Sequence, residues 1–426
     1  MDKTVIEQRE QAIIVGMVRP DQGRHQVEEY LDELELLADT AGAEVIERVV
    51  QSRNKIDPAF MLGRGKIREL AQMAKYLDAD LVIFDEDLSP AQLKNIESLV
   101  KVKLLDRSGL ILDIFAKHAR TREARTQVEL AQLNYMLPRL TRQWTHLSRQ
   151  AGGIGTRGPG ETQLEVDRRF IRKRIANLEL ELEKISKQRD NRRKQRRDIY
   201  KAALVGYTNA GKSTILNELT NADVLVEDRL FATLDSTVRA LEFSEQEKLL
   251  LIDTVGFIRK LPHHLVASFK STLEQVRDAD LLLHVVDISS YEFSEQMKTV
   301  HKVLKDLGAD DKPRLYIFNK LDLLKDRSVI EEIKSTFPDS VFIAAARGLF
   351  MDDLKKTLAD WLEKQSREIQ VSIPLDQSKL MSKMHDLARV LNVEYTENHA
   401  VMNLLANQTN AARIERMLER QSPEGL

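Results

Sequence analysis

KAALVGYTNAGKST, the stretch from Lys201 to Thr214, decides how the rest of this sequence is interpreted. The pattern G-x-x-x-x-G-K-[ST] is filled by Gly206, Gly211, Lys212 and Ser213. The apolar run 202–205 predicts the strand that must precede such a loop, and residues 214–219 predict the helix that must follow it. The pattern and its context together indicate a phosphate-binding loop.

The residue types of this loop suit the phosphates of a nucleotide. Glycines allow consecutive backbone N–H groups to point at phosphate oxygens, and the helix N-terminus adds partial positive charge. Lys212 is expected to reach the β- and γ-phosphates and Ser213 to ligate Mg²⁺. The alternative, a glycine turn with a chance lysine, is disfavoured by the strand–loop–helix context. The predicted nucleotide contacts in this loop are Gly206, Tyr207, Thr208, Asn209, Ala210, Gly211, Lys212, Ser213 and Thr214.

The composition indicates a globular protein of several domains. A chain of 426 residues, 42% hydrophobic and 31% charged, is long enough for roughly three domains. Cysteine is absent, which excludes disulfides, thiolate chemistry and Cys-zinc sites. The stretch MDKTVIEQREQ lacks the apolar core of a signal peptide, and no apolar run approaches the roughly 18 residues of a membrane span. We expect a cytoplasmic protein with no stable membrane insertion.

The fold class expected is α/β, in four parts. Residues 1–116 alternate β-like and helical runs, which predicts a small parallel-sheet α/β domain. Residues 117–198 predict a long helical hairpin. Residues 199–366 predict a second α/β domain, organised by the phosphate loop, with a doubly wound, mainly parallel sheet. Residues 367–426 predict a small α+β module, in which one amphipathic helix is expected to run through Leu380, Met384, Leu387 and Leu391.

Two apolar stripes predict that the hairpin is antiparallel. Between them lies AGGIGTRGPGET, which no helix would tolerate, and Thr162 with Glu165 is expected to cap the helix that follows. Pro138 must kink or interrupt the first arm. The stripes consist of Leu130, Leu133, Leu137, Leu140, Trp144 and Leu147 in the first arm, and Leu164, Ile171, Ile175, Leu178, Leu182 and Ile185 in the second.

The hairpin is also strongly basic. Although the whole chain has a net charge of −2, residues 117–201 contain 22 Lys and Arg against 10 Asp and Glu. Such an excess favours contact with a phosphate backbone over the alternative of a merely solvated helical face. Because few aromatic residues lie among these charges, structured RNA fits better than a single strand.

Two further motifs identify the base. Asp253 ends the apolar run KLLLID, where a carboxylate can hold the hydration shell of Mg²⁺, and the Gly256 N–H can meet the γ-phosphate. In RLYIFNKLD, a carboxylate at Asp322 can accept hydrogen bonds from N1–H and the 2-amino group of guanine, a pair that adenine lacks. Lys320 can cover the base with its stem, and Asn319 can tie this loop to the phosphate loop.

These motifs resemble those of the translation-factor-related GTPases, and the chain closely resembles the HflX family within them. Three longer segments carry the resemblance: DEDLSPAQLKNIE at 85–97, LDRSGLILDIFAKHARTREARTQVELAQLNYMLPRL at 105–140 and GGIGTRGPGETQLEVDRR at 152–169. The resemblance implies binding to the large ribosomal subunit, dissociation of stalled or idle ribosomes, and hydrolysis that the ribosome stimulates. It implies GTP or GDP and Mg²⁺ as ligands, with the basic hairpin touching rRNA. We expect a monomer.

The resemblance also assigns individual residues. Thr233 would be the switch threonine that ligates Mg²⁺, and Ala345 would offer its N–H to guanine, next to Ala344 in place of the common serine. Phe257 stands where many GTPases carry the glutamine that orients water, which implies slow turnover alone. Asn209 stands where related GTPases ligate K⁺; an ordinary loop hydrogen bond is the alternative. Catalysis is thus assigned to Lys212, Thr233 and Gly256, and the metal to Ser213, Thr233 and, through water, Asp253.

A GTP-hydrolysing switch on the ribosome is therefore the leading interpretation. One alternative is an ATP- or GTP-dependent RNA-remodelling enzyme, which the residues Asn319, Lys320 and Asp322 disfavour. Another is a GTP-dependent regulator whose coiled coil docks on a protein partner. Salt separates this last possibility from RNA binding, because only RNA binding weakens steeply as salt rises.

Overall fold

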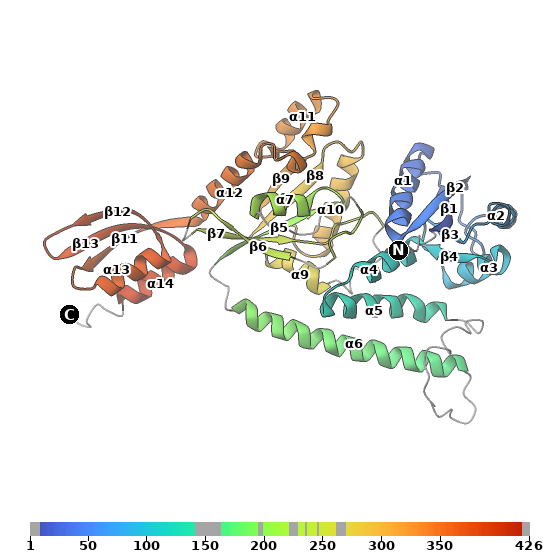
Figure 1. The fold of residues 1–426 in the computed structure, drawn as a ribbon, viewed down its shortest axis with the longest axis horizontal. Coiled ribbons are helices and arrows are strands. Elements are labelled where there is room, and N and C mark those ends of the chain that lie inside the picture. The colour runs from blue at the N-terminus through green and yellow to red at the C-terminus, as the bar shows by residue number, and fades with distance from the viewer. Residues whose placement is uncertain are drawn as a thin grey trace, which may run out of the picture. The chain divides into compact units, whose positions relative to one another are not determined.

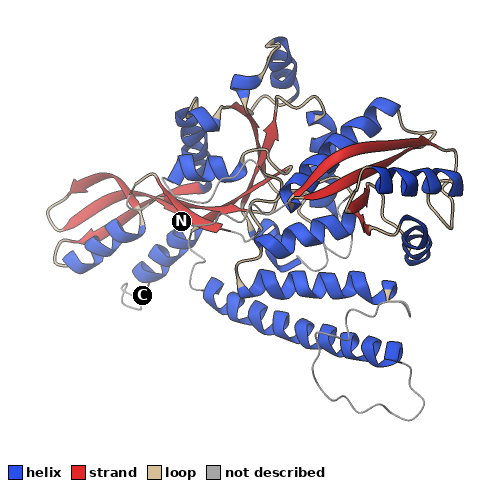
Figure 2. Cartoon of the chain, turned by 45° about the vertical axis from the view of Figure 1, so that its right-hand side comes forward, coloured by secondary structure: helices blue, strands red, loops and turns tan. Residues whose placement is uncertain are grey.

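The computed structural model describes residues 9–140, 163–194, 199–220, 229–234, 237–244, 247–260 and 270–419. By their contacts, the residues form two compact units. The first contains Met1–Lys187, Glu227–Asp235 and Lys260–Ser271, and the second contains the remainder. Within the described ranges, no helix is both long and apolar enough to cross a membrane. Figure 1 labels the elements, and Figure 2 shows their strands in three separate sheets.

The first unit begins with a four-stranded parallel sheet in the order β2-β1-β3-β4. The predicted capping box of one helix is present, since Gln92 N donates to Ser89 Oγ while Ser89 N donates to Gln92 Oε1. The small α/β domain expected from the sequence is therefore confirmed. Its elements are β1 (Glu10–Val18), α1 (Arg24–Ala41), β2 (Ala43–Ser52), α2 (Arg64–Tyr76), β3 (Leu81–Phe84), α3 (Pro90–Val100), β4 (Lys103–Asp106) and α4 (Arg107–His118).

A helical hairpin follows, and all of it up to Lys187 belongs to this unit. Its arms are α5 (Arg122–Met136) and α6 (Gln163–Lys194), and a 3₁₀ turn, η1 (Leu137–Arg139), interrupts the first arm at Pro138 as predicted. Ion pairs join Arg122 to Glu181 at 2.7 Å and Glu129 to Arg174 at 2.6 Å. Since later residues of α5 meet earlier residues of α6, the arms are antiparallel. The glycine-rich tip and the predicted cap at Thr162 lie outside the described residues.

The second unit is built on a six-stranded sheet in the order β10-β9-β8-β5-β7-β6, in which only β6 runs antiparallel. Its strands are β5 (Tyr200–Gly206), β6 (Thr237–Glu242), β7 (Lys248–Asp253), β8 (Leu281–Asp287), β9 (Arg314–Asn319) and β10 (Val341–Phe342). Its helical segments are α7 (Lys212–Thr220), α9 (Lys270–Asp278), α10 (Phe293–Asp306), η3 (Leu321–Leu323), α11 (Ser328–Thr336), η4 (Ala345–Arg347) and α12 (Met351–Gln365).

Both faces of this sheet are covered, which confirms the doubly wound fold. Adjacent residues of a strand point to opposite faces, and Val285 and Val286 of β8 belong to different apolar clusters. The cluster around Val285 includes Leu216 of α7, whereas the cluster around Val286 includes Met297 of α10. Strand β5 lies in the interior of the sheet, so the loop that follows it opens at the carboxyl edge, where doubly wound folds bind ligands.

The carboxyl-terminal module is a three-stranded antiparallel sheet, ordered β11-β13-β12, with two helices. The prediction that one helix runs from Leu380 through Leu391 is wrong at its end. Helix α13 ends at Leu387, and Leu391 lies in strand β12 with 45% of its surface exposed. Backbone pairing with β13 and partial burial of Val390 and Val393 outweigh the three-and-four spacing. The elements are β11 (Ser366–Pro374), α13 (Ser378–Leu387), β12 (Arg389–Tyr395), β13 (His399–Asn407) and α14 (Gln408–Glu419).

Candidate nucleotide-binding site

The loop between β5 and α7 passes so close to its neighbours that two positions require glycine. A Cβ at Gly206 would lie 2.3 Å from the carbonyl oxygen of Val285. At Gly211, where φ is +94°, a Cβ would lie 2.2 Å from Asn319 Nδ2. The backbone thus forms the tight turn at the end of a buried strand that a phosphate cradle needs, as the sequence predicts.

Lys212 lies beneath this loop. Its side chain is buried, and Nζ donates hydrogen bonds to the carbonyl oxygens of Gly206 at 3.2 Å and Tyr207 at 2.8 Å. Burial lowers the pKa of Lys212 to about 8, and the nearby Asp253 opposes that shift. The buried amine of Lys212, which carries a positive charge when protonated, therefore lies under the loop at the first residue of α7, next to the positive end of the helix dipole.

Ser213 and Asp253 supply oxygen ligands of the kind that Mg²⁺ prefers. Ser213 Oγ donates to Asp253 Oδ2 at 2.6 Å, and Asp253 is completely buried at the end of β7. Among the described residues, no group of three or more His, Cys, Asp or Glu side chains could hold a metal ion. Because proteins usually bind Mg²⁺ through one or two side chains together with water and substrate phosphates, Ser213 and Asp253 stay the predicted side-chain ligands.

The segment D-T-V-G, residues Asp253–Gly256, is tied to the phosphate loop through the residue that follows it, Phe257. Phe257 N donates to Gly206 O at 3.0 Å, and Thr208 N donates to Phe257 O at 2.8 Å. A Cβ at Gly256 would lie 2.8 Å from Thr208 Cα, so the two loops are in close contact. The Phe257 side chain is 1% exposed and points into the core, in agreement with the expectation that it cannot orient water.

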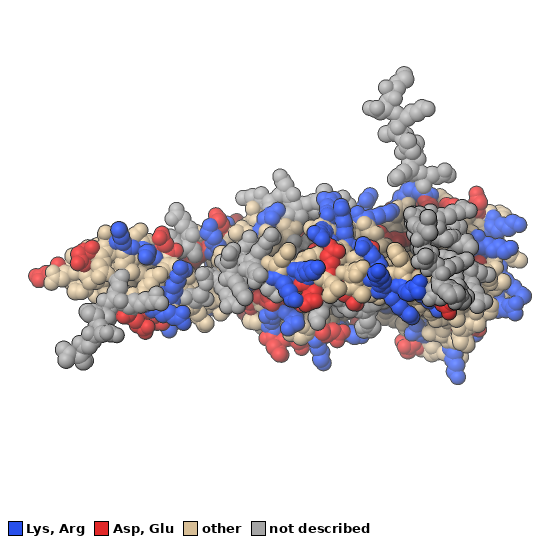
Figure 3. Space-filling view, turned by 90° about the horizontal axis from the view of Figure 1, so that it is seen from below, with Lys and Arg blue, Asp and Glu red and all other residues tan. Residues whose placement is uncertain are grey.

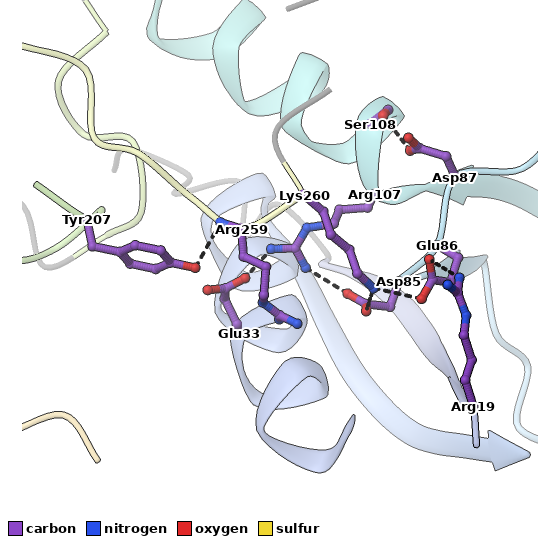
Figure 4. Close-up of polar contacts among 10 residues, drawn as sticks. All are labelled: Arg19, Glu33, Asp85, Glu86, Asp87, Arg107, Ser108, Tyr207, Arg259 and Lys260. Atoms are coloured by element: carbon purple, nitrogen blue, oxygen red, sulfur yellow. Dashed lines mark hydrogen bonds and ion pairs between the residues drawn. The ribbon is translucent and has the colours of Figure 1, made fainter. Parts of the chain in front are cut away.

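One contact of this segment has no counterpart in the sequence motifs. Arg259 N donates to the hydroxyl of Tyr207 at 2.9 Å, which fixes the segment two residues beyond Phe257 (Figure 4). The variable positions of the phosphate-loop pattern allow any side chain, so the pattern contains no signal for this bond.

Asn319 joins three loops, which confirms the predicted tie to the phosphate loop. Its Nδ2 donates to Ala210 O at 2.9 Å, and its Oδ1 accepts from Ala345 N at 3.0 Å. All three residues are buried. The Ala345 N–H, which the resemblance assigns to guanine, thus already donates to Asn319.

Lys320 and Asp322, which with Asn319 form the motif N-K-x-D at 319–322, have ion-pair partners that the sequence did not predict. Lys320, with φ of +64°, places Nζ 2.7 Å from Asp287 Oδ2 at the end of β8. Asp322 accepts from Arg347 Nε at 2.9 Å, in the loop that follows β10. Asp287 ends β8 and Arg347 lies shortly after β10, at the same edge of the sheet as Lys320 and Asp322. Their positions at strand ends were the sequence signal that could have placed these partners near the motif.

The surroundings of Thr233 and Asn209, the residues predicted to ligate Mg²⁺ and K⁺, do not test those roles. Thr233 belongs to the first unit, between the buried side chains of Phe231 and Leu234. Asn209 is exposed with φ of +59°. Their roles in binding Mg²⁺ and K⁺ stay predictions.

A doubly wound sheet whose phosphate loop, D-T-V-G segment and N-K-x-D loop bond to one another defines a P-loop GTPase. Three family models match successive parts of the chain. They are described as the GTP-binding GTPase N-terminal region, at residues 28–116, the GTP-binding GTPase middle region, at residues 118–196, and the 50S ribosome-binding GTPase, at residues 201–320.

The chain belongs to the HflX family of GTPases, and its reaction is the hydrolysis of GTP. It is 46% identical to GTPase HflX of Caldanaerobacter subterraneus, over 91% of this chain and 89% of that protein. It is 43% identical to GTPase HflX of Escherichia coli, over 88% of this chain and 89% of that protein. A GTP-binding protein of Sulfolobus solfataricus, solved in complex with GDP, is 24% identical, with a TM-score of 0.43 over 82% of this chain and 98% of that one.

Proposed function

We propose that this HflX GTPase is a GTP-dependent switch that binds the large ribosomal subunit through rRNA and dissociates stalled or idle ribosomes. The observation that carries the proposal is the helix α6, on which three exposed basic side chains form no ion pair with another described residue, and which precedes β5 and the phosphate loop in the sequence. The match of residues 201–320 to a family described as 50S ribosome-binding supports the same partner. Ribosome binding implies work in the cytoplasm.

For the nucleotide, we propose that each loop has its own task. The phosphate loop from Gly206 to Thr214 would hold the phosphates, with Lys212 on the β- and γ-phosphates. Mg²⁺, when bound, neutralises charge on those phosphates; Ser213, Thr233 and, through water, Asp253 would hold it. The base would be read by Asn319, Lys320, Asp322 and Ala345. Asn209 would complete a K⁺ site.

Slow intrinsic turnover is part of the proposal. Phe257 is buried and carries no group that can orient water, so the chain's own contribution would come from Lys212, Thr233 and the Gly256 N–H. A group from the ribosome would complete the site. GTP hydrolysis should therefore accelerate when large subunits are added.

The proposed RNA-binding face lies on the described part of α6. Arg172, Lys173 and Lys184 are exposed and form no ion pair with other described residues. By contrast, Arg174 and Lys187 already pair with Glu129 and Glu183. Figure 3 shows both basic and acidic side chains on the face that it presents. These three side chains are the best candidates for phosphate contacts, because none of them has to give up an ion pair with a described residue.

Co-sedimentation with separated ribosomal subunits tests the partner and the switch together. The protein should pellet with the large subunit in a non-hydrolysable GTP analogue and much less in GDP. Added to intact ribosomes with the same analogue, it should increase the separated subunits. Equal sedimentation in both nucleotides would contradict the switch, and preference for the small subunit would contradict the partner.

A charge-neutral variant tests the RNA-binding face. Changing Arg172, Lys173 and Lys184 to glutamine should weaken binding to the large subunit. If all three side chains contact phosphates, the plot of log affinity against log salt should become less steep by about 3. The matched control changes three exposed lysines of α12 to glutamine, namely Lys355, Lys356 and Lys364. A control that weakens ribosome binding as much as the test variant would show that only overall charge matters.

A further inference from the structure

Two short loops of the second unit bring a guanidinium to the carboxylate that is proposed to read the base. Asp322 lies in η3, after β9, and Arg347 ends η4, after β10. Arg347 Nε lies 2.9 Å from Asp322 Oδ2. Both loops belong to the second unit and leave the sheet at the same edge, since β9 and β10 are parallel. The ion pair therefore involves the one side chain on which the choice of guanine is proposed to depend.

The backbone on the Asp322 side of this pair is fixed. The residue before it donates from Leu321 N to Ile343 O at 3.1 Å, and the residue after it donates from Leu323 N to Lys320 O at 3.0 Å. The side chain of Asp322 is 13% exposed. The carboxylate thus has a defined position and little access to water, so the groups that donate to it decide much of its energy.

The backbone on the Arg347 side is fixed too, but the side chain is not enclosed. Arg347 N donates to Ala344 O at 3.0 Å, and Ala344 and Leu349 exchange two backbone bonds at 3.1 and 3.2 Å. The Arg347 side chain, by contrast, is 64% exposed. A long side chain with that exposure can turn into solvent without disturbing the core, so its bond to Asp322 can be broken at a small cost.

Arginine and guanine offer a carboxylate the same kind of partner. In the guanidinium, N–H groups on one carbon form a planar fork that suits the two oxygens of a carboxylate. In guanine, N1–H and the 2-amino group are attached to one ring carbon in the same way, and Asp322 is proposed to accept from both. Because both donors are planar and bond best to two carboxylate oxygens, Arg347 and guanine compete for Asp322.

We propose that Arg347 sets the affinity for guanine nucleotides by competing with the base for Asp322. The arginine turns away when the base forms its two bonds, and it takes the carboxylate again when the base leaves. The competition weakens the binding of GTP and GDP by the same factor, because both carry the same base. It also speeds the release of GDP, since the shielded carboxylate regains a donor as soon as guanine departs. The inference rests on the proposed role of Asp322.

Nucleotide binding to the full chain tests the competition. Kd for GDP and for a non-hydrolysable GTP analogue would be measured by titration calorimetry, and the release of fluorescently labelled GDP by stopped flow. Arg347→Ala should lower both Kd values by about three- to fivefold, the range expected for removing a partly exposed ion pair, and should slow GDP release. Arg347→Lys keeps the charge without the planar fork and should lie between Arg347→Ala and the wild type.

A matched control removes another exposed arginine of the same unit. Arg367, 57% exposed, forms an ion pair with Glu415 in the carboxyl-terminal module. Arg367→Ala should leave both Kd values within 1.5-fold of the wild type. A decrease as large as that of Arg347→Ala would mean that net charge, and not competition for Asp322, changes the affinity, and would overturn the proposal.

A double-mutant cycle shows whether Arg347 acts through Asp322. In the Asp322→Asn background, Arg347→Ala should change the Kd for GDP by less than 1.5-fold, because the ion pair is already gone. The proposal fails if Arg347→Ala alone leaves GDP binding unchanged or weaker, or if its tightening persists undiminished in that background.

Asp322→Asn alone separates this inference from the proposed function. If Asp322→Asn binds GDP as tightly as the wild type, the proposed recognition of the base is wrong, and the competition is wrong with it. If Asp322→Asn weakens GDP binding while Arg347→Ala behaves as the wild type, Asp322 reads the base and only the competition is wrong.

Discussion

Asn319→Ala is the sharpest test of how the nucleotide site is assembled. The change removes the donor to Ala210 O and the acceptor of Ala345 N, which are 2.9 and 3.0 Å from the amide atoms. Ala210 and Ala345 are 1% and 0% exposed, so water cannot replace the lost partners unless the loops move. Each unsatisfied buried group costs about 1–3 kcal/mol. The loss should therefore be at least about 2 kcal/mol, or roughly 30-fold in the affinity for GDP.

Isothermal titration of GDP into the full chain measures this loss. The matched control is Asn410→Ala in the carboxyl-terminal module, where Nδ2 donates to Leu387 O at 2.8 Å. That change should reduce stability but leave the affinity for GDP within twofold. If Asn319→Ala also binds GDP within twofold of the wild type, the bonds of Asn319 do not hold the site together.

Two substitutions and a change of pH have defined outcomes. Asp322→Asn should lower GDP affinity about 100-fold, through loss of charge-assisted hydrogen bonds of about 1.5–3 kcal/mol each, and should improve binding of xanthosine diphosphate. Gly211→Ala should abolish GDP binding, since its Cβ would lie 2.2 Å from Asn319 Nδ2, whereas Gly308→Ala, at φ of +65° in open space, should not. Burial lowers the pKa of His284 from 6.5 to about 3, so stability should fall below pH 6.5, by about 2 kcal/mol at pH 5.

Each of these predictions has an outcome that contradicts it. Unchanged preference for guanine in the Asp322 variant would remove the proposed basis of recognition. Equal effects of the two glycine changes would mean that backbone strain, rather than the clash, decides binding. For His284 the unfolded chain takes up a proton that the folded chain excludes, so His284→Phe should flatten the pH dependence measured by urea unfolding. An equal slope in that variant would place the acid sensitivity elsewhere.

Elements with regular local patterns could be predicted from the sequence. The capping box at Ser89 and the interruption of α5 at Pro138 depend on residues within one turn, and both are present. The helix predicted through Leu391 failed for the opposite reason. A spacing of three and four residues is compatible with a helix, but pairing of β12 with β13 decides the structure there, and this pairing depends on residues elsewhere in the chain.

The sequence by itself determined the order of the GTPase motifs and the tie through Asn319, because each motif is a short pattern at the end of a strand. Tertiary structure alone decided the partners Arg347 and Asp287, the bond between Tyr207 and Arg259, and the ion pairs of Lys260 with Asp85 and Glu86. Lys260 and Asp85 are 175 residues apart. Hydrogen bonds and ion pairs over such separations depend on where the folded backbone places two side chains, and no local pattern in either segment encodes that position.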